Sequence, residues 1–111
     1  MRVRSKIWLE VDGEAVFGRG REALLKAIDK FGSINKAARH TNVSYRKALS
    51  YIQTTERRLG TSLVERKTGG LHGGGATLTD EAREFLRKFE SLEQGVNEMI
   101  DKKFIEMFGK Q

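Results

Sequence analysis

The stretch GSINKAARHTNVSYRKA, residues 32–48, contains two helical patterns separated by a short polar break. Ser33 and Ser44 each stand just before one pattern, where a hydroxyl can accept a hydrogen bond from a free N–H of the first helical turn. The first pattern turns its small and apolar residues inward, namely Ile34, Ala37 and Ala38. Because small side chains let two helices cross closely, the stretch predicts a helix-turn-helix.

Helical spacing extends this motif in both directions. A preceding helix should begin at Arg21 and end at Gly32, with an apolar face made by Leu24, Leu25, Ile28 and Phe31. The helix capped by Ser44 should run to about Leu59, with an apolar face made by Ala48, Leu49, Ile52 and Leu59. The sequence therefore predicts a core of three helices over residues 21–60.

Two short hairpins are expected on either side of this core. Residues 3–11 alternate apolar and polar side chains, which predicts a strand, and Asp12-Gly13 is a strong turn signal before a returning strand over 14–17. Residues 1–18 should thus form an N-terminal hairpin. Residues 62–78 predict a second hairpin, because two short apolar segments enclose a polar loop, residues 67–75, that holds five of the twelve glycines. Such a hairpin after a helix-turn-helix is a wing.

A long helix should follow over residues 79–108. Thr79 is a plausible N-cap, and Asp80 and Glu81 carry negative charge where the helix dipole favours it. Apolar residues then recur every three or four positions, which is the spacing of a helix-pairing seam. The sequence leaves open whether this seam packs on its own domain or on a second copy, and we favour a dimer interface made by Phe85, Phe89, Leu92, Val96 and Met99.

Together these patterns predict one domain over residues 1–111. Its class is mostly α with a small β component (α+β): a winged helix-turn-helix with an N-terminal hairpin and a long C-terminal helix.

The positive charge of the chain is concentrated in its middle. The net charge is +6, and residues 33–75 alone contain eight basic and two acidic side chains. A local excess of this kind is expected of a protein that binds a polyanion, although an ordinary solvated basic face would look the same. The first turn of the predicted second helix of the motif, residues 44–47, combines two hydroxyls with Arg46 and Lys47, side chains suited to phosphate and guanine.

Other function classes find little support. The chain has no cysteine, and its two histidines, His40 and His72, are far apart, so we expect no metal site and no cofactor. No set of nucleophile, base and orienting residue is apparent, so we expect no enzyme. There is no signal peptide and no apolar stretch long enough to cross a membrane, which favours the cytoplasm and argues against a membrane partner.

Several segments resemble the N-terminal DNA-binding domain of the ModE family of molybdate-responsive regulators. The most specific are Ser44-Tyr45-Arg46-Lys47-Ala48 and the combination of Thr68-Gly69-Gly70 with Gly73-Gly74-Gly75-Ala76 and Leu78-Thr79. The chain is similar, more loosely, to the N-terminal domain of LysR-type regulators. One departure is Ala82, at a position where the family usually has glycine.

The resemblance implies a homodimer that binds palindromic double-stranded DNA and regulates transcription. It implies that residues 44–47 begin the recognition helix and that residues 66–75 form the wing. Family members continue into molybdate-binding domains that this chain does not reach, so we do not expect it to bind molybdate. The predicted DNA-binding residues are Lys36, Ser44, Tyr45, Arg46, Lys47, Tyr51, Arg66, Lys67, Thr68 and His72. Gln53 is expected on the same exposed side of the helix as Tyr51.

Two alternatives to a sequence-specific regulator remain open at this point. One is an architectural protein that binds DNA through phosphates alone, with no sequence preference. The other is a winged helix that docks a protein partner and whose basic face is incidental.

Overall fold

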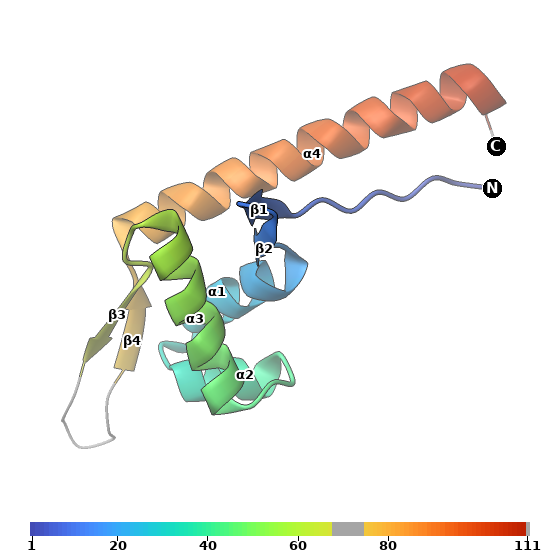
Figure 1. The fold of residues 1–111 in the computed structure, drawn as a ribbon. Helices are drawn as coiled ribbons and strands as arrows, with labels where there is room; N and C mark the ends of the chain where they lie inside the picture. Colours follow the sequence, from blue (N-terminus) through green and yellow to red (C-terminus); the bar gives the residue numbers. More distant parts are fainter. Residues whose placement is uncertain (68–74, 111) are drawn as a thin grey trace.

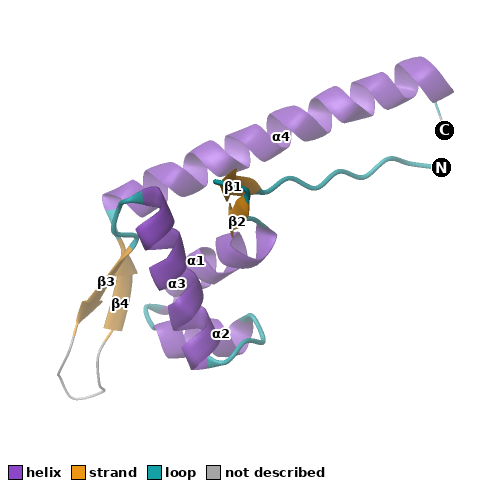
Figure 2. Cartoon of the chain, in the orientation of Figure 1, coloured by secondary structure: helices purple, strands orange, loops and turns teal. Residues whose placement is uncertain are grey.

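Figure 1 shows the computed structural model, which describes residues 1–67 and 75–110. A hairpin of β1 (Leu9–Val11) and β2 (Glu14–Phe17) leads into α1 (Arg19–Phe31), α2 (Ile34–His40) and α3 (Tyr45–Leu59). A second hairpin, β3 (Val64–Lys67) and β4 (Gly75–Leu78), precedes α4 (Asp80–Phe108). Helices dominate, and each hairpin is a separate two-stranded antiparallel sheet (Figure 2).

The helix boundaries follow the capping residues predicted from the sequence. Ser33 and Ser44 accept hydrogen bonds from the backbone N–H of Lys36 and Lys47, and Thr79 accepts one from Ala82. At the other ends, Gly32 and Gly60 adopt left-handed conformations with φ of 65° and 70°, which glycine adopts without the steric cost of a Cβ atom. The first helix begins at Arg19, two residues earlier than predicted.

The first strand is shorter than predicted. Alternation suggested a strand over residues 3–11, but only Leu9–Val11 pairs, because β2 has four residues before Gly18 begins the turn into α1. Residues 3–8 form no strand, but the exposure of their side chains alternates: Val3, Ser5 and Ile7 are half-buried, and their neighbours are exposed. This N-terminal segment runs beside α4 (Figure 1), and the Ser5 hydroxyl donates a hydrogen bond to the Asn97 side-chain oxygen.

One apolar core joins all the elements except the distal half of α4. Phe17 lies at its centre and is 1% exposed. Its ring meets Phe85 and Phe89 of α4 edge to face, with ring centroids 4.8 and 4.9 Å apart. Buried Thr55 of α3 donates a 3.0 Å hydrogen bond to the Val16 carbonyl oxygen, so the N-terminal hairpin is fixed to α3 by both packing and a buried polar contact.

The turn between α2 and α3 is tight because two alanines let the helices approach closely and one asparagine adopts a left-handed backbone conformation. Ala37 and Ala48 are completely buried where the helices approach. Asn42 has φ of 60°, a conformation that asparagine tolerates better than most residues, and Val43 N–H then donates to the Ala38 carbonyl. The predicted helix-turn-helix geometry is thereby formed.

Candidate nucleic-acid interface

The first turn of α3 presents a basic, solvated surface. The side chains of Arg46 and Lys47 are exposed, and within the described ranges neither forms an ion pair with a carboxylate. Ser44 is the N-cap of the helix, so one lone pair of its hydroxyl is already used, although its O–H remains a donor. Two cations without partners at the start of a helix can approach phosphates or base edges.

The outward face of α3 extends this surface along the helix. Arg46, Ser50, Gln53 and Arg57 are spaced by four, three and four residues and are all exposed, so they share the face opposite the core. Sequence reasoning singled out Gln53 but missed Ser50 and Arg57. Counting the helical period from Arg46 would have found both residues. Ala48 and Ile52 mark the buried face of the helix, so the residues on the opposite face are expected to be exposed.

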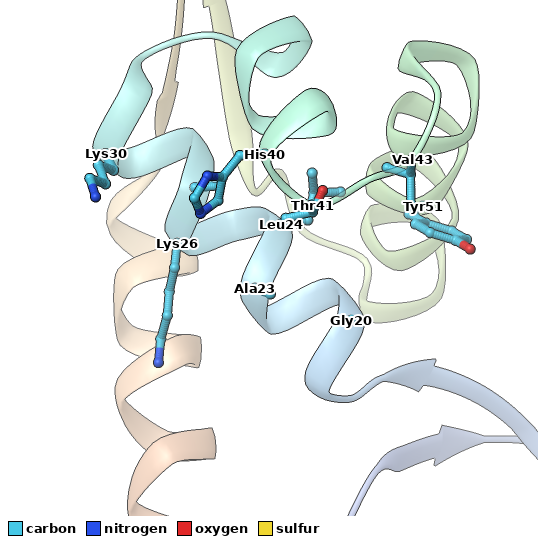
Figure 3. A pocket seen from close by; sticks show the side chains of 10 residues that line it. Gly20, Ala23, Leu24, Lys26, Lys30, His40, Thr41, Val43 and Tyr51 are labelled. Carbon is cyan, nitrogen blue, oxygen red and sulfur yellow. The ribbon is translucent and has the colours of Figure 1, made fainter.

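Tyr51 lies elsewhere than expected. It is half-buried on one flank of α3, and the Arg21 guanidinium stacks on its ring at 4.8 Å. Figure 3 shows Tyr51 beside the α2–α3 turn, where it lines a hollow of about 570 Å³ together with Gly20, Ala23 and Leu24 of α1. Tyr51 therefore does not share the outward face with Arg46.

The opposite flank of α3 holds the base of the wing. Arg66 of β3 donates a 2.9 Å hydrogen bond to the Tyr45 hydroxyl, which links the first wing strand directly to the first turn of α3. Lys67 is exposed next to it. At the other end of α3, the Glu56 carboxylate accepts hydrogen bonds from Leu63 N–H at 2.7 Å and Val64 N–H at 3.2 Å. These three hydrogen bonds hold the start of β3, at the base of the wing, beside α3.

The remaining predicted DNA-binding residues divide into two groups. Lys36 is exposed in the first turn of α2, and its backbone N–H is used by the Ser33 cap while its ammonium group is in solvent. Thr68 and His72 lie outside the described residues.

The residues of the predicted dimer seam on α4 fall into two groups, one packed in the core and one exposed. Phe85 and Phe89 pack on Phe17 in the core, and Phe89 is only 2% exposed. Contrary to the prediction, the Phe89 ring is therefore not available to a second chain. The reason is that α4 crosses the N-terminal hairpin at these residues. Leu92 and Met99, further along the same seam, are 48% and 58% exposed, and Val96 is half-buried.

Neither a metal site nor a membrane span is found among residues 1–67 and 75–110. No group of three or more His, Asp or Glu side chains gathers there in a way that could hold a metal ion. No helix in these ranges is long and apolar enough to cross a membrane.

The fold and its basic face agree with a known family. Residues 23–83 match the sequence model described as bacterial regulatory helix-turn-helix protein, lysR family. The chain belongs to this family. Its members are regulatory proteins, which agrees with the expectation that the chain is not an enzyme.

Curated relatives named ModE are similar to this lysR-family domain. ModE of Haemophilus influenzae, a transcriptional regulator, is 40% identical over 74 residues, which is 67% of this chain and 29% of that protein. The molybdenum transport protein ModE of Azotobacter vinelandii is 34% identical over 101 residues, or 91% of this chain and 37% of that protein. The DNA-binding transcriptional dual regulator ModE of Escherichia coli K12 is 38% identical over 74 residues, or 67% and 28%.

These matches confirm the resemblance to ModE regulators. This lysR-family domain is a helix-turn-helix DNA-binding domain related to them. The chain spans about a third of the length of these curated relatives.

Two solved structures share the fold. A CbnR_DBD–DNA complex has a TM-score of 0.56 at 23% identity, covering 75% of this chain and 90% of that chain. ArgP from Mycobacterium tuberculosis has a TM-score of 0.51 at 21% identity, covering 80% and 30%. The predicted winged helix-turn-helix class is confirmed.

Proposed function

We propose that this domain binds specific sequences in double-stranded DNA as a homodimer, inside the cell, and regulates transcription. The observation that carries the proposal is the outward face of α3, where Arg46, Ser50, Gln53 and Arg57 lie exposed in one row. A B-form major groove is about 12 Å wide and admits one helix. Arg and Gln can each make paired hydrogen bonds to a base edge, so this row has the chemistry for reading sequence as well as for binding phosphate.

The wing supports the same mode of binding. Arg66 and Lys67 lie at the base of the wing, in β3, and the hydrogen bond from Arg66 to Tyr45 sets that base beside the recognition helix. When α3 occupies the major groove, these two cations reach the backbone that borders it. Phosphate contacts of this kind position the protein and make its affinity depend on salt.

The distal half of α4 supports a homodimer. Leu92, Val96 and Met99 continue the helical seam beyond the core, and Leu92 and Met99 expose about half of their surface. The helix has 29 residues, so it is about 44 Å long and extends beyond the body of the domain (Figure 1). A second copy of the same seam would cover these side chains, and two α3 helices about 34 Å apart would then enter successive major grooves.

Selection of bound duplexes from a random pool tests sequence preference. We expect a palindromic site that binds at least about a thousandfold more tightly than a scrambled duplex at the same salt concentration. Equal binding of both duplexes with a steep salt dependence would instead establish an architectural DNA-binding protein. No binding to either duplex would leave a winged helix that docks a protein partner.

Arg46→Ala tests the recognition helix itself. If Arg46 reads a guanine, the substitution weakens binding to the selected site by about 1–3 kcal/mol and relaxes the preference at one base pair. Lys88→Ala, on the exposed side of α4, is the matched control and should leave both affinity and preference unchanged. An equal reduction on every DNA sequence would show that Arg46 contacts phosphate rather than a base.

A further inference from the structure

A basic hollow lies on the flank of α3 opposite the wing. Its volume is about 390 Å³, and it is formed where the N-terminal segment, the start of α1 and the middle of α3 meet. Figure 1 shows the β3–β4 wing on one side of α3 and the β2–α1 junction on the other. The charged and aromatic side chains that line this hollow are Lys6, Trp8, Arg19, Arg21 and Tyr51.

Three cations line this hollow, and its Trp8 donates a 2.8 Å hydrogen bond from Nε1 to the Glu10 carboxylate. Within the described residues, Lys6, Arg19 and Arg21 form no ion pair, and no Asp or Glu side chain lines the hollow. Asp101 lines a neighbouring hollow beside Lys6 and Arg19 but pairs with neither. Because like charges held close together repel, an anion bound among them would be favoured electrostatically.

Three cations elsewhere on the domain pair with carboxylates of other elements. Lys26 pairs with Glu90 at 2.9 Å, Arg83 pairs with Asp29 at 2.8 Å, and Arg58 pairs with Glu14. These contacts lie between elements and hold them together. Lys6, Arg19 and Arg21 form no such ion pair within the described residues, so ion pairing between elements does not explain why they gather here.

Arg21 adds a geometric observation. Its guanidinium carbon lies over the Tyr51 ring, 4.8 Å from the ring centroid, and its buried Nε atom has no hydrogen-bond partner within the described chain. The fixed fork of a guanidinium suits two oxygens of one phosphate or carboxylate. The positive end of the α1 dipole adds to the same potential, because α1 begins at Arg19.

We propose that this hollow binds a phosphate group. Its position favours a DNA backbone phosphate: with α3 in the major groove, the wing cations face one bordering strand and the hollow faces the other. This source rests on the proposed function. A free phosphorylated compound would be recognised by the same chemistry, and the two sources are separable by experiment.

The DNA arm compares two double variants. Lys6→Gln with Arg19→Gln removes two exposed cations of the hollow whose side chains lie outside the core, whereas Lys102→Gln with Lys110→Gln removes two exposed cations at the distal end of α4. Affinity for the selected duplex and for a scrambled duplex is measured over a series of salt concentrations. We expect the hollow variant to bind both duplexes about tenfold more weakly and to lower the salt slope by about one for each phosphate that it no longer neutralises. The control variant should match the wild type.

The free-phosphate arm uses Trp8, which is the only tryptophan of the chain and lines the hollow. Sodium pyrophosphate is titrated into the protein while Trp8 fluorescence is recorded, with sodium chloride at matched ionic strength as the control. A saturable change with pyrophosphate, absent with chloride and absent in the Lys6→Gln, Arg19→Gln variant, establishes a site for a free phosphorylated compound.

A third variant separates phosphate recognition from charge alone. Arg21→Lys keeps the positive charge but removes the planar fork, so it should weaken phosphate binding in whichever arm is positive, and circular dichroism checks that the domain remains folded.

The outcomes distinguish this proposal from the function on which it partly rests. A lower salt slope in the hollow variant identifies DNA as the source, and pyrophosphate binding without DNA binding keeps the phosphate site while rejecting the proposed function. If the hollow variant has the same DNA affinity and salt slope as its control, and Trp8 does not respond to pyrophosphate, the phosphate site is rejected even where Arg46→Ala still impairs DNA binding.

Discussion

The two halves of α4 share one helix and one apolar seam, yet they have opposite environments. In the proximal half, Ala82, Leu86 and Phe89 are buried against the hairpin and α1. In the distal half, Leu92 and Met99 are about half exposed, although they continue the same spacing. A helical seam therefore identifies an apolar surface, but the size of the domain sets how much of that surface is buried within one chain.

The largest effect should follow from removing a proximal side chain. Phe89→Ala deletes a buried ring that packs edge to face on Phe17, so it should lower the free energy of unfolding by about 3–5 kcal/mol. Phe104→Ala, a half-buried ring in the distal half, is the matched control and should cost less than about 1 kcal/mol. Urea unfolding measures both. Equal effects would mean that the distal half is packed as firmly as the proximal half.

A distal change should instead act on association. Leu92→Asp with Met99→Asp places charge in the exposed seam, so it should raise the dimer dissociation constant by about a hundredfold or more, since two apolar side chains would no longer be buried. Sedimentation equilibrium over a range of concentrations measures this. Lys102→Asp, at an exposed position of the same half, serves as control. If the double variant associates like the wild type, the distal seam is not the dimer interface.

Gly95 lies in the distal half, and its replacement should stabilise the helix. A Cβ atom added at Gly95 would meet nothing within 4 Å, so Gly95→Ala should raise the free energy of unfolding by about 1 kcal/mol. Gly60→Ala is the contrasting variant, because Gly60 has φ of 70° and the same substitution there should lower stability. A decrease of stability in Gly95→Ala would indicate that a neighbouring chain approaches the helix at this point.

The smallest effect should come from the boundary between the halves, where α1 meets α4. Burial raises the pKa of Glu22 above its ordinary value of 4.5, and a hydrogen bond and charge repulsion from Glu93 raise it further, whereas Lys26 lowers it. An acid with a raised pKa in the folded state contributes most stability below pH 4.5, and that contribution is lost as pH rises through the raised value.

Glu22→Gln should therefore make the domain slightly more stable at pH 7 and reduce the decline in stability above pH 4.5. Urea unfolding at a series of pH values measures it. Glu84→Gln is a control of opposite sign, because a hydrogen bond from Arg87 lowers the pKa of Glu84. If Glu22→Gln gives the same pH profile as the wild type, Glu22 does not titrate differently in the folded state.

Local chemistry explains why most element boundaries could be predicted from the sequence. Ser33, Ser44 and Thr79 satisfy free N–H groups at helix starts, and Gly32 and Gly60 adopt the left-handed conformation at helix ends. These requirements are met within a few residues of the chain. The predicted strand over residues 3–11 was wrong in length because pairing requires a partner strand, and β2 is only four residues long.

The candidate site was partly predictable for the same reason. Arg46 and Lys47 were recognised from the exposed first turn of α3, and the base of the wing from two short apolar segments around glycines. The sequence analysis expected Tyr51 on the exposed face of α3, whereas it lies on the flank next to Arg21 of α1. The sequence of α3 alone does not show which of its flanks other elements will pack against. Arg21 and Lys6 are far from Tyr51 in sequence, and no local pattern brings them together.

Local sequence was enough to predict the helices, their caps, the helix-turn-helix and the basic middle segment, since each depends on residues a few positions apart. Packing of the folded domain places Phe85 and Phe89 in the core, brings the Arg66 side chain to Tyr45, and gathers three unpaired cations beside α3. The physical reason is that burial and charge clustering depend on which distant surfaces come into contact, and that is settled by packing of the whole domain.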